Sequence, residues 1–133
     1  TGGYIAHLIT SVSGSSDYYL GSVVSYANAV KLNTLGVNEN DLNNYGAVSQ
    51  QVVEQMALGV KKLLHTDYAI ATSGIAGPLG GTDEKPVGTV WIAIATPNGI
   101  ASKLFMMGEH RERTIRKTAI SALNMLRKEL VRG

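Results

Sequence analysis

The sequence of 133 residues contains no cysteine, so it can form no disulfide, no thiolate zinc site and no cysteine nucleophile. No apolar run approaches the roughly 18 residues that a membrane-spanning helix needs. No segment has the charged and apolar regions that are typical of a signal peptide. We therefore expect a soluble, cytoplasmic protein with no membrane partner.

A strong excess of charge of one sign is also absent, since the formal net charge is +2. Most of the basic side chains lie in the last quarter of the chain: Arg111, Arg113, Arg116, Lys117, Arg127, Lys128 and Arg132. A nucleic-acid interface would need a broader basic surface with interleaved aromatic residues, so this group favours a local anion site or a solvated helix face. The histidines His7, His65 and His110 lack the spacing of metal ligands. We expect no nucleic-acid partner, no metal and no cofactor.

At this length we expect one domain over residues 1–133. Periodicity predicts helices over residues 3–10, 27–36 and 49–64, and a C-terminal helix of about 18 residues. It predicts strands over residues 18–26, 67–74, 89–96 and 100–107, with Pro97-Asn98-Gly99 as a hairpin turn between the last two. This order favours an α/β fold, a three-layer α/β/α sandwich whose mixed sheet contains one antiparallel hairpin.

A glycine-rich loop, TSGIAGPLGGTDEKPVG, follows the buried strand at residues 67–74, where open α/β sheets present their ligand sites. Its closely spaced glycines let backbone N–H groups approach an anion or a planar ring: Gly74, Gly77, Gly80 and Gly81. The loop lacks the Gly-Lys-Ser/Thr of a P-loop and the glycine spacing of a dinucleotide-binding turn. A ligand-binding loop and a flexible surface loop both remain open on these grounds.

Tyr26 and Lys31 flank the expected junction between a strand and a helix, which allows both side chains to point at one spot. A lysine at the edge of an apolar site loses its proton more easily than a free one and can act as a base toward a hydroxyl nucleophile, with a tyrosine hydroxyl as relay. Spacing alone favours the simpler interpretation, an amphipathic anchor and a solvated charge.

Arg111 and Arg113 stand near the start of the last helix, where they could bind a phosphate with help from the helix dipole. The alternative is a solvated first turn in which Glu109 and Glu112 pair with the neighbouring arginines.

Considered as a set, four stretches resemble the C-terminal domain of the CinA family, named for competence and damage inducibility. They are TGGYIAHLITSVSGSSDYYLGSVVSYANAVKLNTLGV, GAVSQQVVEQMALGV, DYAIATSGIAGPLGGTDEKPVGTVWIAIA and GEHRERTIRKTAISALNMLRKEL, which cover nearly the whole chain. The resemblance implies a nicotinamide mononucleotide amidohydrolase of pyridine nucleotide recycling. Such an enzyme hydrolyses the carboxamide of the nicotinamide ring to give nicotinic acid mononucleotide and ammonia.

The resemblance also implies roles for residues. The family pattern around the nucleophile looks like Ser-Cys-Thr-Gly-Gly, and Thr1, Gly2 and Gly3 match its last three positions, so the serine would stand two residues before Thr1. Lys31 would take the serine proton and Tyr26 would relay it, while backbone N–H groups of the Thr1-Gly2-Gly3 turn would hold the oxyanion. Arg113, or Arg111, would bind the phosphate of the substrate. Ribose or carboxamide contacts would come from Ser73, Gly74, Ala76, Gly77 and Thr82.

A different class of function remains as the alternative, because the 133-residue sequence does not include the serine and could by itself be inactive. It is a non-catalytic module that binds a nucleotide or supports assembly of a competence or damage-inducible protein. Many family members also carry an N-terminal domain that has no counterpart here, so we expect a stand-alone form or an excised domain. The apolar 18–26 strand makes a homo-oligomer plausible.

Overall fold

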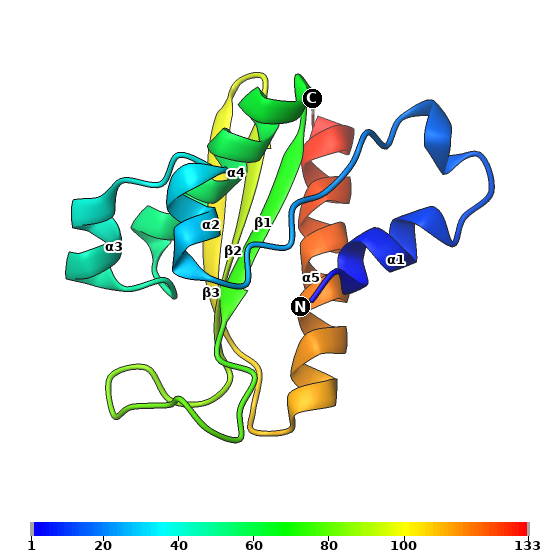
Figure 1. Cartoon of the computed structure of the whole chain (residues 1–133). Helices are drawn as coiled ribbons and strands as arrows, with labels where there is room; N and C mark the ends of the chain where they lie inside the picture. Colours follow the sequence, from blue (N-terminus) through cyan, green and yellow to red (C-terminus); the bar gives the residue numbers. More distant parts are fainter. Residues whose placement is uncertain (1, 133) are drawn as a thin grey trace.

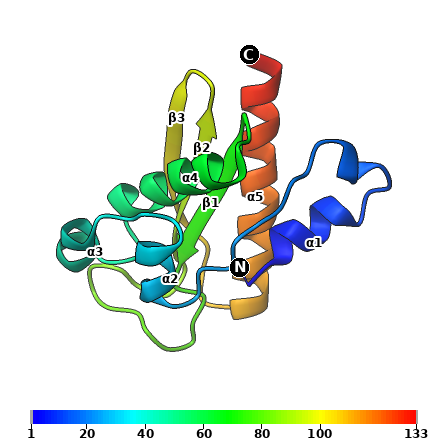
Figure 2. The same cartoon turned by 45° about the horizontal axis from the view of Figure 1, so that its top comes forward.

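The computed structural model describes residues 2–132 and has helices on both faces of a single sheet (Figure 1). Helix α4 covers one face and α5 the other, and α1 packs beside α5 (Figures 1 and 2). The elements are α1 (Tyr4–Thr10), the short 3-10 helix η1 (Ser15–Asp17), α2 (Asn28–Asn33), α3 (Glu39–Tyr45), α4 (Gln50–Leu64), β1 (Ala69–Gly74), β2 (Thr89–Thr96), β3 (Gly99–Met106) and α5 (Arg111–Arg132). The predicted α/β class and its three layers are confirmed.

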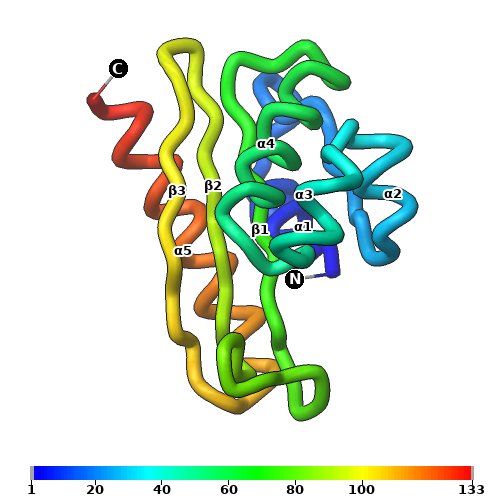
Figure 3. Tube along the Cα trace, turned by 90° about the vertical axis from the view of Figure 1, so that its left-hand side faces the viewer, coloured from blue at the N-terminus to red at the C-terminus, as the bar shows by residue number. Residues whose placement is uncertain are grey.

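The central strand β2 supplies both halves of the core. It pairs antiparallel with β1, where Ala71 faces Ala93, and with β3, where Ala93 faces Ser102. Because successive side chains of a strand point to opposite faces, Ala93 packs toward α4 while Ile92 and Ile94 pack toward α5, all three fully buried. Figure 3 follows β2 and β3 side by side along their length.

Helix α4 forms as the sequence predicts. The Ser49 side chain accepts a 3.3 Å hydrogen bond from the Val52 backbone N–H and caps the first turn. The apolar stripe then buries Val52, Val53, Met56 and Ala57 against the sheet. At Gly59 the helix crosses the chain after α2 so closely that an added Cβ would lie 1.9 Å from the Leu35 carbonyl oxygen.

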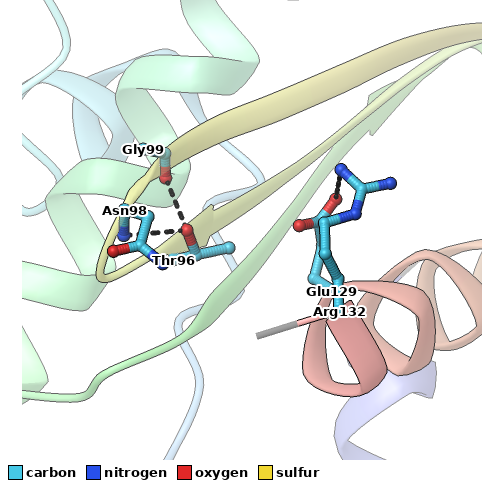
Figure 4. A network of polar contacts seen from close by, with 5 residues as sticks. All are labelled: Thr96, Asn98, Gly99, Glu129 and Arg132. Atoms are coloured by element: carbon cyan, nitrogen blue, oxygen red, sulfur yellow. Dashed lines mark hydrogen bonds and ion pairs between the residues drawn. The ribbon is translucent and has the colours of Figure 1, made fainter.

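The predicted hairpin is also confirmed. The Thr96 side chain donates a 3.2 Å hydrogen bond to the Gly99 carbonyl oxygen and accepts one of 3.1 Å from the Asn98 backbone N–H (Figure 4). Figure 4 also shows Arg132 and Glu129 at the end of α5, 3.8 Å apart, which form the single ion pair found within residues 2–132.

The predicted strand over residues 18–26 is wrong, and with it the mixed sheet. Tyr18 lies in the turn that ends η1, residues 19–26 join no strand of the described chain, and the sheet of β1, β2 and β3 is antiparallel throughout. A Cβ added at Gly21 would lie 3.6 Å from Leu64, so the segment passes over the end of α4. Its β-branched and aromatic residues favour an extended backbone, but a ladder also needs a neighbouring strand in register.

Candidate functional site

Lys31 is a buried cation on a short helix. It lies in the last turn of α2, its side chain is only 7% exposed, and its Nζ donates a 2.7 Å hydrogen bond to the carbonyl oxygen of Ser25. Burial lowers the pKa of Lys31 below its ordinary value of 10.5, because desolvation penalises the charged ammonium. A lysine in this state gives up its proton more readily than a solvated one, which is the property that a general base needs.

Tyr26 does not point at Lys31. Its side chain is 83% exposed, and no hydrogen bond between the two residues is found. The reason is the alternation of an extended backbone: Ser25 faces inward and is half-buried, so Tyr26, the next residue, faces solvent. The structure brings Lys31 to the backbone beside Tyr26 but leaves the tyrosine hydroxyl away from it.

The start of α1 lies against the same segment. Gly2 and Gly3 have φ angles of 58° and 91°, in the left-handed region that favours glycine, and Gly3 forms the N-cap of the helix. A Cβ added at Gly3 would lie 3.5 Å from Val24. Gly3 therefore lies beside Val24 and Lys31 contacts Ser25, so two positions that are far apart in the sequence meet the same short segment. Thr1, the first residue of the predicted oxyanion turn, lies outside the described residues.

The glycine-rich loop is closed at its base by backbone hydrogen bonds. The Ile75 N–H donates to Thr89 at 2.9 Å, and the Gly88 N–H donates to Ile75 at 2.7 Å. Gly77 has a φ of 82° and precedes Pro78 through a cis peptide bond. A Cβ at Gly74 would lie 2.7 Å from the Val90 side chain, so this strand end accepts only glycine without displacement.

Two of the polar residues predicted to contact substrate already have protein partners. The Ser73 hydroxyl donates a 2.8 Å hydrogen bond to the Ala47 carbonyl oxygen. The Thr82 hydroxyl accepts one of 3.0 Å from the Lys85 backbone N–H. The Lys85 ammonium in turn donates to the carbonyl oxygen of Tyr45 at the end of α3. These contacts hold the end of β1 and the loop against the end of α3 and the residues that follow it.

Arg111 and Arg113, the two candidates for phosphate binding, have different surroundings. Arg111 Nη1 donates a 2.7 Å hydrogen bond to the Gly77 carbonyl oxygen, which ties the start of α5 to the glycine-rich loop. Arg113 is exposed; its backbone N–H donates to His110 Nδ1 at 3.3 Å. No described ion pair joins either arginine to Glu109 or Glu112, so the internal pairing considered from the sequence is not found.

A small cavity, which sequence analysis missed, lies between the end of β1 and the first turns of α5. Thr118 lines it with a side chain that is 98% buried, and its hydroxyl oxygen has no hydrogen-bond partner within residues 2–132. In Figures 1 and 2 the N-terminal end of α1 lies beside this part of α5. The spacing of Thr114 and Thr118, one helical turn apart, is the signal that could have found it. The lining residues are Thr72, Gly74, Ala76, Val90, Thr114, Ile115 and Thr118.

Two features are absent from the described part of the chain. Residues 2–132 contain no group of three or more histidine, aspartate and glutamate side chains placed to hold a metal ion. None of the helices described is both long and apolar enough to cross a membrane.

The fold and the site together define a class of protein: an α/β sandwich domain with a buried lysine on a short helix, a helix that begins on glycines, and a glycine-rich loop closed at its base by backbone hydrogen bonds. The family model described as "CinA C-terminal domain" matches residues 1–130, and the chain belongs to this family. The predicted resemblance is therefore confirmed.

Individual relatives agree with this assignment. A "CinA-like protein" of Microcystis aeruginosa is 52% identical over 134 residues, which is 98% of this chain and 32% of the relative. The crystal structure of a competence/damage inducible protein from Agrobacterium tumefaciens is 39% identical, with a TM-score of 0.92 over 94% of this chain and 77% of that one. A competence damage-inducible protein A from Klebsiella pneumoniae is 33% identical, with a TM-score of 0.93 over 98% and 81%. The chain spans about a third of the length of the curated relatives it matches.

Proposed function

We propose that this domain belongs to a nicotinamide mononucleotide amidohydrolase. The observation that carries the proposal is the burial of Lys31, with its lowered pKa, on the segment that also meets the glycine start of α1. In the family pattern the nucleophilic serine stands two residues before Thr1. A serine at that position would be joined to α1 through the Thr1-Gly2-Gly3 turn, whose last residue lies beside Val24, next to the Ser25 that Lys31 contacts.

In the proposed reaction the upstream serine is the nucleophile and Lys31 is the base. Lys31 Nζ, in its neutral form, accepts the serine hydroxyl proton while the serine oxygen forms a bond to the carboxamide carbon. Backbone N–H groups at Gly2 and Gly3 are available to the oxyanion of the tetrahedral intermediate. The C–N bond breaks and ammonia leaves with the proton that Lys31 held. Water then cleaves the acyl-enzyme and gives nicotinic acid mononucleotide, and Tyr26 would relay protons in these steps if its side chain turned inward.

Substrate binding divides between the loop and α5. Since Arg111 already donates to the Gly77 carbonyl oxygen, we assign it to holding the loop and assign the exposed Arg113 to the phosphate. Backbone groups of the loop and the Thr82 hydroxyl, which accepts a hydrogen bond from Lys85 and can still donate one, would contact the ribose or the carboxamide, because the Ser73 hydroxyl already donates its proton to Ala47.

The test uses the chain extended upstream to include the proposed serine, assayed for ammonia and nicotinic acid mononucleotide. Lys31→Ala should lower kcat about 100-fold or more, whereas Lys62→Ala, which changes an exposed lysine on α4, should leave it unchanged. An extended, folded protein that releases no ammonia from nicotinamide mononucleotide would contradict the proposal.

One observation favours the second candidate, a non-catalytic nucleotide-binding or assembly module. The exposure of Tyr26 leaves the relay position beside Lys31 without its tyrosine. Under this alternative the extended protein binds nicotinamide mononucleotide in a calorimetric titration but never turns it over. Turnover that depends on Lys31 would exclude it.

A further inference from the structure

A hollow larger than the Thr118 cavity lies between the glycine-rich loop and the residues just before α5. It is lined by residues 78–83, residues 86–87 and Glu109, and its volume is about 580 Å³. Clefts that bind small molecules usually measure about 300–1,000 Å³. In Figures 1 and 3 the loop and the connection into α5 lie beyond the same end of the sheet. The Met107 N–H joins them by donating a 2.8 Å hydrogen bond to the Gly88 carbonyl oxygen.

Part of the lining suits a flat, apolar ring. Pro78, Leu79 and Pro86 contribute apolar carbon atoms, and the Leu79 side chain is 86% exposed. Gly80 and Gly81 lie between them and carry no side chain, so a ring can approach the backbone closely at these two positions. An exposed leucine beside bare backbone gains most from a ligand that covers it with an apolar face.

The charged side chains that line the hollow are both acidic, Asp83 and Glu109. No hydrogen bond or ion pair within residues 2–132 involves either carboxylate. The neighbouring cations bond to backbone carbonyl oxygens instead: Lys85 donates to Tyr45, and Arg111 donates to Gly77. The hollow therefore offers a ligand two carboxylates that are not neutralised by direct contact with a cation of the described chain.

We propose that this hollow binds a pyridinium ring substituted on its nitrogen, and that Asp83 and Glu109 select the ring by its positive charge. Such a ring combines flat apolar faces with a cationic charge, and the lining offers both a matching wall and the opposite charge. The carboxylates would repel a phosphate, which agrees with the assignment of the phosphate to Arg113. This inference rests on the proposed function, whose substrate carries a pyridinium ring, and adds the residues that distinguish this ring from a neutral one.

NMR titration of the 133-residue chain tests ring binding without turnover. The probe is nicotinamide methylated on its ring nitrogen, and unmodified nicotinamide is its neutral counterpart. The cation should shift the backbone amide signals of Gly80 and Gly81, and nicotinamide should bind about tenfold more weakly. Because exposed ion pairs are weak, Asp83→Asn and Glu109→Gln should each weaken binding of the cation only about threefold. Glu112→Gln removes an exposed carboxylate of α5 that does not line the hollow, and should leave this affinity unchanged.

Three results of the titration would overturn the proposal. They are equal affinity for the cation and for nicotinamide, unchanged affinity in both Asp83→Asn and Glu109→Gln, and equal affinity for tetramethylammonium, a cation without a ring. Salt provides an independent check of the charge contribution. At about 1 M salt the Debye length falls to about 3 Å, so binding of the methylated ring should weaken toward that of nicotinamide.

Kinetics of the chain extended upstream separate this inference from the proposed function. Asp83→Asn and Glu109→Gln should each raise KM for nicotinamide mononucleotide about threefold and lower kcat less, because they act on binding of the ring. Glu112→Gln is again the control. Turnover with a KM that neither substitution changes would refute this inference and leave the proposed function standing. Binding of the methylated ring that depends on both carboxylates, without any release of ammonia, would refute the proposed function and support the ring site.

Discussion

The Lys31 ammonium donates a 2.7 Å hydrogen bond to the backbone carbonyl oxygen of Ser25, so a buried cation is held one residue away from the exposed Tyr26. The carbonyl offers the ammonium one acceptor but no opposite charge. Burial therefore dominates its electrostatics and lowers its pKa. The same contact fixes the end of the extended segment to α2.

This burial predicts how stability changes with pH. In the unfolded chain Lys31 keeps its proton up to the ordinary pKa of 10.5, whereas in the folded chain it loses the proton at lower pH. Between the two pKa values the unfolded state binds more protons, so the free energy of unfolding rises with pH there, and below the folded pKa the full penalty remains. Lys31→Met removes this penalty. It should therefore raise the free energy of unfolding at neutral pH and make that free energy depend less on pH.

Urea unfolding at about pH 7 and about pH 10 measures this effect. Lys62→Met, a substitution of an exposed lysine, serves as control and should follow the unmodified chain. If Lys31→Met shows the same pH dependence as that control, the burial of the ammonium has no energetic consequence.

Thr118 provides a second test through its buried hydroxyl without a partner. Thr118→Val keeps the shape of the side chain and removes the polar atom, so it should raise the free energy of unfolding by about 1 kcal/mol. The matched control is Thr89→Val, because the buried Thr89 hydroxyl donates a 2.6 Å hydrogen bond to the Pro86 carbonyl oxygen. The Thr89→Val variant loses this hydrogen bond, so its free energy of unfolding should fall by about 1 kcal/mol. A lower free energy of unfolding in both variants would show that the Thr118 hydroxyl does have a hydrogen-bond partner.

Gly59 should resist replacement even though it lies inside a helix. Alanine is favoured over glycine there by about 1 kcal/mol of helix propensity. An added Cβ, however, would lie 1.9 Å from the Leu35 carbonyl oxygen and must force α4 and the end of α2 apart. We expect Gly59→Ala to lower the free energy of unfolding by about 1–3 kcal/mol, as overpacking usually does, in chemical denaturation. The neighbouring half-exposed Leu58→Ala should change it much less, and a stabilised Gly59→Ala would contradict this packing.

Alanine substitutions of Arg111 and Arg113 in α5 should affect different properties, the first the stability of the loop and the second substrate binding. Arg111→Ala removes the hydrogen bond to Gly77, so amide hydrogen exchange in the 75–88 loop should become several-fold faster. Arg113→Ala should leave exchange unchanged and, in the extended protein, raise KM for nicotinamide mononucleotide more than it lowers kcat. If Arg113→Ala instead speeds amide hydrogen exchange in the loop and Arg111→Ala raises KM, the roles assigned to the two arginines are reversed.

Local signals were sufficient for most of the fold. Ser49 before an apolar stripe predicted the start and the buried face of α4, and Pro97-Asn98-Gly99 between two apolar runs predicted the hairpin. These features depend on residues that are close in the chain. The 18–26 segment failed as a strand for the opposite reason: its composition favours an extended backbone, but a ladder depends on a distant neighbour.

For the candidate site, too, some features follow from local sequence and others only from tertiary packing. The sequence by itself determined the CinA family, the glycine-rich loop and the position of Lys31 on a helix, because motifs and capping act over short distances. Only the tertiary structure decided that Lys31 is buried on Ser25 while Tyr26 faces solvent, that Arg111 holds the loop, and that Thr118 is enclosed without a partner. Burial and side-chain direction arise when segments far apart in the chain pack together, and no local pattern carries that information.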